Sequence, residues 1–341
     1  MVKRPTIADL AKAAGVSVAT VDRVLNGRLP VSADTAARVT QAAETIGFHA
    51  VGLLKQRLVA VPRRTFGFLL QKRSEPFYQA LAAGLTEAVH AADFIRGRAL
   101  VEFVDELNPV AIAERLRELA PRVDGLALVA MDHPAVNEAI EWATAQGKPV
   151  LTLLTDVTAP SRAGCVSVDR RRSGRTAAWA VTRLAEKPGR IGILIGSHRY
   201  LSQEVSEISF RSYVREYAPS FQVLEPVVVL DDPRIAYEAV VDMLASNPGL
   251  VGIYSAGGGG NGVAEATRDE RAASRIVVVC NELTTVTRAS LIDGTVDLVL
   301  GTPIAALARA AVEALERAVA GTAEGRVEIL LPADLHISES V

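Results

Sequence analysis

Apolar positions in the first fifty residues recur at helical spacing in three short runs. Each run follows a residue whose side-chain oxygen can cap a helix: Thr6, Ser17 or Ser32. Gly15 separates the first two runs, and Gly47 ends the third. The pattern predicts two short helices joined by a glycine turn and braced by a third, which is the helix-turn-helix arrangement. An ordinary three-helix cap on an enzyme would show the same spacing.

Beyond about Thr65 the pattern changes to short apolar runs that alternate with longer amphipathic segments. The apolar runs predict strands at 66–70, 100–104, 126–130, 150–154, 191–195, 227–230, 251–254 and 276–280. The amphipathic segments predict helices at 77–92, 111–119, 135–146, 174–186, 236–245 and 304–319. Strand and helix alternation of this length is typical of parallel α/β sheets, and we expect two of them.

Charge is distributed unevenly along the chain. Residues 1–64 contain ten Lys and Arg against four Asp and Glu, a net charge of +6. The remainder contains 27 basic against 35 acidic residues, a net charge of −8. A small basic head on a larger acidic body favours a nucleic-acid-binding module joined to a domain with another task.

Composition argues against several classes of protein. Proline or charge breaks the longest apolar runs well before the roughly 18 residues that span a bilayer, and no apolar signal segment follows Met1. Cys165 and Cys280 are too few and too far apart for a metal cluster or a disulfide framework. The histidines lack metal-ligand spacing, and no serine lies in a G-x-S-x-G motif. We therefore expect a cytoplasmic protein with no membrane span, no metal and no catalytic residue.

The segment Thr6-Ile-Ala-Asp-Leu-Ala-Lys-Ala-Ala-Gly-Val-Ser-Val-Ala-Thr-Val-Asp-Arg-Val-Leu-Asn-Gly closely resembles the DNA-binding head of the lactose-repressor (LacI) family. Pro76-Phe77-Tyr78 and the ending Leu330–Leu335 are also similar to that family. The resemblance implies a helix-turn-helix head at 1–48 and a hinge helix with linker at 49–64. It further implies a domain at 65–341 for effector binding and dimerisation, made of two α/β lobes like those of periplasmic sugar-binding proteins, with three crossovers.

The same resemblance implies which residues contact DNA. The second helix would enter the major groove, with Val18 and Ala19 at the family's variable specificity positions and Arg23 reaching a guanine or a phosphate. Phosphate contacts would come from residues with a side-chain oxygen, several at helix starts: Thr6, Ser17, Asn26, Ser32 and Thr35. Asp22 departs from the family's usual serine, and we expect it to pair with Arg23 or another neighbour, or to contact a cytosine.

The hinge also departs from the family pattern. Ala50-Val51 replaces the usual Pro-Asn, and Arg57 stands where a leucine commonly enters the minor groove. Leu53, Leu54 and Leu58 remain as candidate wedges, of which we select Leu54 together with Arg57 as DNA-contacting residues.

A glycine-rich segment supports an alternative function. Gly257, Gly259 and Gly262 satisfy G-x-G-x-x-G after an apolar run, and Glu282 follows 20 residues later. These are the features of a dinucleotide-binding fingerprint, so the alternative is an NAD-dependent α/β enzyme. The motif's late position favours instead a loop that lines an effector cleft, as the resemblance implies, and we expect no cofactor.

The cleft itself should lie at the carboxyl ends of the strands, between the lobes. The candidates follow predicted strands or lie on the second lobe: Phe77, Tyr78, Asp132, His133, Thr155, Asp156, Glu207, Arg211, Gly258, Asn281 and Glu282. An aromatic ring flanked by carboxylates suits a neutral polyhydroxylated ligand such as a sugar, polyol or cyclitol. Gly258, Gly301 and Ser206 stand where sugar binders of this kind commonly carry Asp, Gln and Arg.

These observations predict a cytoplasmic transcriptional repressor that binds a pseudo-palindromic duplex operator as a homodimer and responds to a small effector. A plain periplasmic binding protein is a third class, and the basic head and missing signal segment argue against it.

Overall fold

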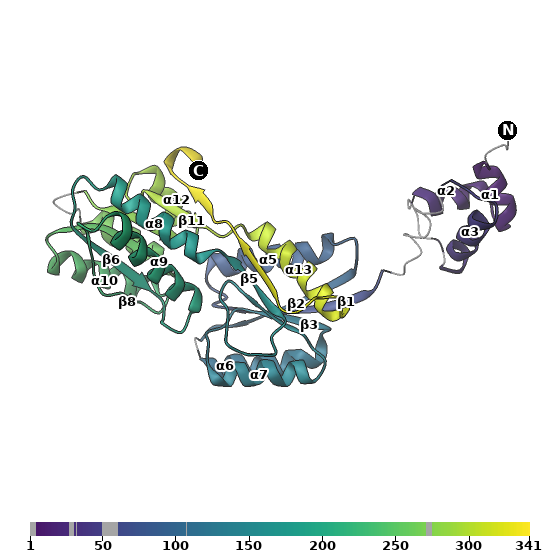
Figure 1. Ribbon diagram of the computed structural model, residues 1–341, viewed down its shortest axis with the longest axis horizontal. Helices are drawn as coiled ribbons and strands as arrows, with labels where there is room; N and C mark the ends of the chain where they lie inside the picture. The colour runs from purple at the N-terminus through teal and green to yellow at the C-terminus, as the bar shows by residue number, and fades with distance from the viewer. Residues whose placement is uncertain (1–4, 27–30, 32, 50–60, 107, 271–274) are drawn as a thin grey trace. The chain divides into compact units, whose positions relative to one another are not determined.

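The computed structural model describes residues 5–26, 31, 33–49, 61–106, 108–270 and 275–341. The chain forms two compact units, Met1–Pro62 and Arg63–Val341, which are described separately below. The second unit consists of two α/β lobes, each built around its own sheet (Figure 1).

The first unit contains three helices, α1 (Ile7–Ala14), α2 (Val18–Asn26) and α3 (Ala33–Thr45). Their apolar faces enclose one core, in which Leu10, Val21 and Val39 are fully buried. Gly15 ends α1 in the left-handed conformation at φ 64°, which glycine adopts without a Cβ penalty, and this turn separates α1 from α2. The predicted helix-turn-helix with its bracing helix is confirmed.

The first lobe contains a six-stranded parallel sheet with helices on both faces. Its strands are β1 (Arg63–Gln71), β2 (Arg96–Val104), β3 (Gly125–Leu128), β4 (Val150–Leu153), β5 (Gly164–Val168) and β12 (Val327–Leu331). Its helices are α5 (Pro76–Ala91), α6 (Pro109–Leu119), the 3-10 turn η1 (Ala120–Arg122), α7 (Pro134–Ala145) and α13 (Ile304–Val319).

The second lobe contains a seven-stranded sheet that is parallel except for β13, which pairs with β11 in the antiparallel sense. Its strands are β6 (Arg190–Ile195), β7 (Gln222–Val223), β8 (Val227–Val228), β9 (Leu250–Ser255), β10 (Val277–Asn281), β11 (Leu298–Gly301) and β13 (Asp334–His336). Its helices are α8 (Arg170–Leu184), α9 (Leu201–Tyr217), α10 (Pro233–Ser246), α11 (Gly260–Glu270), α12 (Thr285–Ile292) and the 3-10 turn η2 (Ser338–Ser340).

The chain crosses between the lobes three times. The strand orders are β12-β5-β4-β3-β1-β2 in the first lobe and β13-β11-β10-β9-β6-β7 in the second, with β8 also paired to β6. The crossings run from β5 to α8, from β11 to α13 and from β12 to β13. All three therefore lie toward the β12 and β13 side of the sheets, and β2 and β8 lie at the opposite side. The predicted class, two parallel sheets after a helical head, is confirmed.

Alternation along the strands explains why both faces of each sheet are covered. Phe66, Phe68 and Leu70 of β1 pack with α5 and α13, whereas Leu69 packs with α6 and α7 on the other face (Figure 1). The second lobe is organised in the same way, because Ile193 packs with α8 and α9 and Leu194 packs with α10 and α11.

Several predicted boundaries differ from those of the structure, and two of the differences have a clear physical reason. The predicted strand at 227–230 ends at Val228, because the backbone turns into the left-handed region at Leu230 with φ 53°. The predicted helix at 174–186 begins four residues earlier, at Arg170, because Asp169 caps it by accepting a hydrogen bond from the Arg172 backbone N–H at 3.0 Å. Within the described residues, no helix is long and apolar enough to cross a membrane.

Candidate functional site

The first two helix starts of the head are capped as the sequence predicts. Thr6 and Asp9 form a reciprocal capping box, in which the Asp9 backbone N–H donates to Thr6 Oγ1 at 3.3 Å and the Thr6 backbone N–H donates to Asp9 Oδ2 at 2.9 Å. Ser17 Oγ accepts the Thr20 backbone N–H at 3.1 Å at the start of α2. These local roles of Thr6 and Ser17 are shown, and phosphate contact by them stays a prediction.

One face of α2 is directed away from the core. Val21 and Val24 are buried, whereas other positions of the helix are exposed: Val18 at 51% exposure, Ala19, Asp22, Arg23 and Asn26. Asn26 Nδ2 donates to Asp22 Oδ1 at 2.6 Å, so the neighbour that pairs with Asp22 is Asn26, one helical turn away. Within the part of the chain that the structure describes, Arg23 forms no hydrogen bond or ion pair.

The remaining predicted DNA contacts divide into two groups. Thr35 lies half-buried on α3. Ser32, Leu54 and Arg57 lie outside the described residues. Sequence reasoning missed the role of Arg38, whose Nη2 donates to the Ala14 carbonyl at 2.9 Å and thereby ties α3 to the end of α1.

A cavity of about 130 Å³ lies between the two lobes of the second unit, at the carboxyl ends of the strands. Six of the eleven predicted effector residues line it: Phe77, Tyr78, Thr155, Gly258, Asn281 and Glu282. The structure adds polar and charged residues that the sequence analysis did not select: Lys72, Glu75, Arg170, Tyr200, Gln203, Asp231, Asn261 and Thr284. Two of these could have been found, because Tyr200 and Asp231 follow predicted strands just as the selected residues do.

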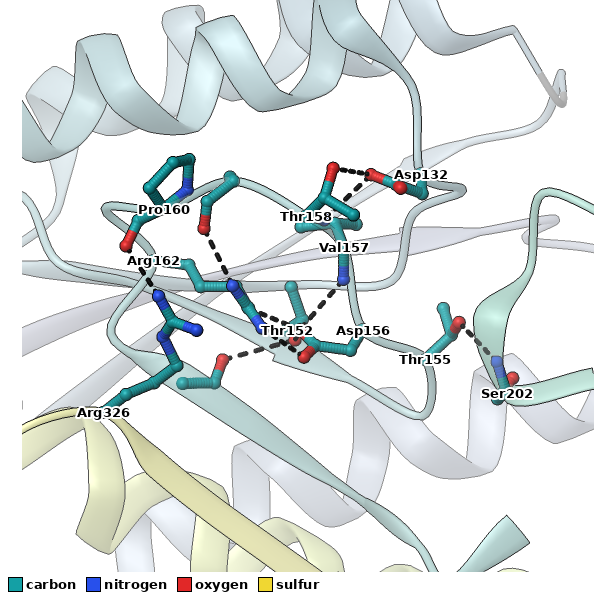
Figure 2. Close-up of polar contacts among 12 residues, drawn as sticks. Asp132, Thr152, Thr155, Asp156, Val157, Thr158, Pro160, Arg162, Ser202 and Arg326 are labelled. Carbon is teal, nitrogen blue, oxygen red and sulfur yellow. Dashed lines mark hydrogen bonds and ion pairs between the residues drawn. The ribbon is translucent and has the colours of Figure 1, made fainter. Parts of the chain in front are cut away.

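Asp132 and His133 do not line the cavity, contrary to the prediction. The Asp132 carboxylate accepts the Thr158 backbone N–H at 2.9 Å (Figure 2). It also accepts Asn137 Nδ2 at 3.0 Å. Burial acts to raise the pKa of Asp132, but these hydrogen bonds outweigh it and lower the pKa overall. His133 caps α7 by accepting the Ala135 backbone N–H at its Nδ1 atom. Both side chains therefore stabilise the first lobe.

Asp156, Glu207 and Arg211 are also absent from the lining of this cavity, although Asp156 lines a neighbouring pocket together with Thr155 and Ser202. Asp156 forms a bidentate ion pair with Arg162, with both nitrogen–oxygen distances at 2.6 Å (Figure 2). Glu207 pairs with Arg211 along α9, and Arg211 Nη2 donates to the Leu224 carbonyl at 2.7 Å. Thr155 Oγ1 accepts the Ser202 backbone N–H of the second lobe at 3.3 Å, whereas the Asp156 carboxylate is directed toward Arg162 (Figure 2).

Three side-chain atoms are buried and lie outside hydrogen-bond distance of a partner among the described residues: Arg170 Nε, Asn281 Oδ1 and Tyr254 Oη. Burial raises the pKa of the Tyr254 hydroxyl, which nevertheless interacts with the Asn281 side chain, and this interaction opposes the effect of burial. The orientation of the Asn281 amide follows from its surroundings, because Nδ2 donates at 2.6 Å to the Ala256 carbonyl, which can only accept. Asn281 Oδ1 is therefore an acceptor. Arg170 Nη2 also lies 3.8 Å from Glu282 Oε1, whose carboxylate accepts Thr302 Oγ1 at 2.6 Å.

The glycine-rich loop contacts a carboxylate of the protein itself. The Gly258 backbone N–H donates to Asp231 Oδ1 at 2.6 Å, and Gln203 Nε2 donates to Asp231 Oδ2 at 3.2 Å. A Cβ at Gly262 would overlap the Pro233 carbonyl, so this glycine serves the close packing of α10 on α11. In a dinucleotide site the loop amides face a phosphate, whereas here the Gly258 amide faces a negative side chain.

Comparison with known proteins gives two family matches. Residues 6–50 match the model described as bacterial regulatory proteins, lacI family, and residues 66–323 match the model described as periplasmic binding protein domain. Similar relatives include the regulatory protein MalI of the maltose regulon of Escherichia coli, 42% identical over 26% of each chain. The regulator GalS of Salmonella typhimurium is 31% identical over 57% of this chain and 54% of its own. The chain thus spans about half or less of the length of these curated relatives.

Solved structures with the same fold include solute-binding proteins of ABC transporters. One from Agrobacterium vitis, bound with α-D-tagatopyranose, has a TM-score of 0.74 at 17% identity and covers 81% of this chain and 95% of its own. Another from Burkholderia graminis, in complex with D-arabinose, has a TM-score of 0.74 at 19% identity over 81% of this chain and 96% of its own.

The matches confirm the resemblance seen in the sequence and favour a regulator over the NAD-dependent enzyme, because the matched relatives are transcriptional regulators. A regulatory head at residues 6–50 precedes a solute-binding fold that occupies most of the chain. The chain carries a helix-turn-helix head of the LacI family of bacterial regulatory proteins, and over most of its length it belongs to the periplasmic binding protein domain family.

Proposed function

We propose that this chain is a cytoplasmic transcriptional repressor that binds a pseudo-palindromic operator as a homodimer and responds to a neutral polyhydroxylated molecule. The observation that supports DNA binding is the exposed face of α2. Val18, Ala19 and Arg23 lie on it, opposite the buried Val21 and Val24, as required of a helix that presents side chains to base edges. The relatives GalS and MalI are regulators by name, which supports the same activity.

The lining of the cavity supports the proposed ligand class. It combines side-chain donors, such as Lys72 and Arg170, with acceptors, such as Glu75 and Glu282. A hydroxyl group can both donate and accept, whereas an ionised carboxylate has no proton to donate. The aromatic ring of Phe77 lines the same cavity and offers an apolar face to a sugar or cyclitol ring. The sugars bound in the similar solute-binding proteins support this class.

Selection of binding sites from a random duplex pool tests the DNA-binding part. We expect the full-length chain to enrich a sequence whose two half-sites are related by a two-fold axis, with an affinity that falls steeply with salt. Enrichment of no sequence above the starting pool would contradict the proposal.

Calorimetry with a panel of sugars, polyols and cyclitols tests the ligand part. We expect one or more of these to bind, and Arg170→Leu to weaken that binding by about tenfold or more, because a buried donor to the ligand is removed. Glu207→Gln is the control, since Glu207 lies outside the cavity and its replacement should leave the affinity within about twofold. Equal affinity of the Arg170→Leu variant would contradict the assignment of this cavity.

A further inference from the structure

Two consecutive residues at the end of β1 connect the first lobe to the second. The Tyr200 hydroxyl of the second lobe donates to Gln71 Oε1 at 2.9 Å. Lys72 Nζ donates to two backbone carbonyls of the second lobe, that of Leu230 at 3.0 Å and that of Asp231 at 2.8 Å. We call the following five residues the inter-lobe clasp: Gln71, Lys72, Tyr200, Leu230 and Asp231.

The orientation of Gln71 is determined by its own lobe. Its Nε2 donates to the Val129 carbonyl at 3.2 Å, which leaves Oε1 to accept other donors. Oε1 then accepts two phenolic hydroxyls, from Tyr78 of the first lobe at 3.3 Å and from Tyr200 of the second lobe at 2.9 Å. Gln71 is 2% exposed. If the hydrogen bond from Tyr200 breaks, the buried Oε1 atom keeps only the longer hydrogen bond from Tyr78, which is unfavourable.

The backbone is strained at the places where Lys72 makes its contacts. Lys72, Leu230 and Asp231 adopt positive φ angles of 42°, 53° and 49°, a conformation that residues with a Cβ rarely adopt. Such a conformation persists only where the surrounding contacts hold it. In this conformation the Lys72 ammonium reaches the second lobe, and the Leu230 and Asp231 carbonyls accept hydrogen bonds from it.

The loop that Lys72 holds is attached firmly to the second lobe. The Asp231 carboxylate accepts the Gly258 backbone N–H and Gln203 Nε2. A Cβ at Gly196, Gly257 or Gly258 would collide with the Asp231 side chain, so these three glycines leave the space that it fills. A pull on the Leu230 and Asp231 carbonyls is therefore transmitted to the ends of β6 and β9.

The clasp lies where it has the most leverage on lobe opening. All three crossovers lie toward the β12 and β13 side of the sheets, whereas β1 and β8, from which the clasp extends, lie toward the opposite side. Rotation of the lobes about the crossovers separates this side the most. The charged donor of Lys72 makes its two bonds the stronger part of the clasp.

We propose that Lys72, assisted by Gln71, is a positioning residue that sets how readily the two lobes separate, and thereby how readily the cavity admits and releases a small molecule. The mechanical part of this proposal does not depend on what the protein binds. Its consequence for ligand exchange rests on the proposed function.

Pulsed electron spin resonance on the full-length chain tests the mechanical part without any ligand. Spin labels at Val110→Cys, at the start of α6, and Arg234→Cys, at the start of α10, place one probe in each lobe next to β2 or β8. Both positions are exposed, and the native Cys165 and Cys280 are buried, so labelling is selective. An excess of unlabelled chain removes distances between different copies.

We expect Lys72→Met to shift the label-to-label distance distribution toward longer distances, with the ratio of open to closed lobes raised by about tenfold or more, as for loss of hydrogen bonds from a charged donor. Lys72→Arg should restore most of the closed population. The matched control is Lys148→Met, because Lys148 Nζ also donates to a backbone carbonyl, that of Val123 at 2.8 Å, but within the first lobe. It should leave the distances unchanged.

Tyr200→Phe is the second test and removes only the hydroxyl that reaches Gln71. We expect a smaller shift in the same direction, since one neutral hydrogen bond is lost. The proposal is overturned if Lys72→Met and Tyr200→Phe, both folded by circular dichroism, give the distance distribution of the unmodified chain. It is also overturned if Lys148→Met opens the lobes as much as Lys72→Met does. Failure of DNA or polyol binding would contradict the proposed function and leave these distances unaffected.

Discussion

Replacement of Arg23 by alanine is the sharpest test of the DNA-binding surface, because the structure separates its effect on stability from its effect on binding. Arg23 is exposed on α2 and forms no hydrogen bond or ion pair among the described residues. Its truncation should therefore change the free energy of unfolding by no more than about 0.5 kcal/mol, as for other exposed sites.

The loss in binding depends on what Arg23 contacts. A bidentate contact to a guanine should cost about 1–3 kcal/mol for the selected operator, which corresponds to about 5- to 150-fold in the dissociation constant, and should relax discrimination at one base pair. A phosphate contact should instead weaken binding to all sequences and lower the salt slope by about one.

Fluorescence anisotropy with labelled operator, repeated at several salt concentrations and with single-base variants, distinguishes these outcomes. Lys12→Ala is the control, because it removes the same charge from the exposed face of α1 without touching α2. It should leave discrimination between bases unchanged. An Arg23→Ala variant that binds the operator and its variants with unchanged affinity and salt dependence would refute the assignment of this face of α2.

Three further predictions follow from the corrected roles of residues in the second unit. Asp156→Ala should lower stability by about 1–3 kcal/mol, since it leaves the mostly buried Arg162 without its bidentate partner, and should leave polyol affinity unchanged in calorimetry. The pKa of Asp132 is lowered in the folded chain, so its stabilisation is present above the ordinary Asp pKa and is lost as pH falls through the folded value; acid unfolding monitored by circular dichroism should show a weaker pH dependence in Asp132→Asn. Burial raises the pKa of Cys165 and Cys280 to about 12, so neither thiol should react with a thiol reagent at pH 8 until the chain is denatured.

The strand and helix pattern sufficed to predict the architecture, because parallel strands buried on both faces give continuous apolar runs. The helical pattern at Ile304–Val319 corresponds to α13 residue for residue, and the run at Phe66–Leu70 lies within β1, which begins three residues earlier. The sequence pattern did not predict elements whose buried residues are partly polar. Helix α9 (Leu201–Tyr217) buries Gln203, Ser206 and Ser209 among its inward residues, so its apolar periodicity is weak.

The cavity was predicted less completely, for a geometric reason. The rule that ligands lie at the carboxyl ends of strands locates a loop, but it does not say to which side each loop residue points. Thr155 and Asp156 are adjacent, yet only Thr155 lines the cavity. Arg170 escaped because the helix was expected to begin at Gly174, which placed this residue in a connection rather than at the first turn of α8 beside the cavity.

The central claim is that a small molecule in the inter-lobe cavity controls DNA binding by the head. It is tested most directly by measuring operator affinity with and without a saturating polyol identified by calorimetry. The account predicts a change of about fivefold or more in the dissociation constant, as for coupled sites in general, and for the Arg170→Leu variant the same change only at a correspondingly higher polyol concentration. Identical operator affinity with and without the bound polyol in the unmodified chain would contradict it.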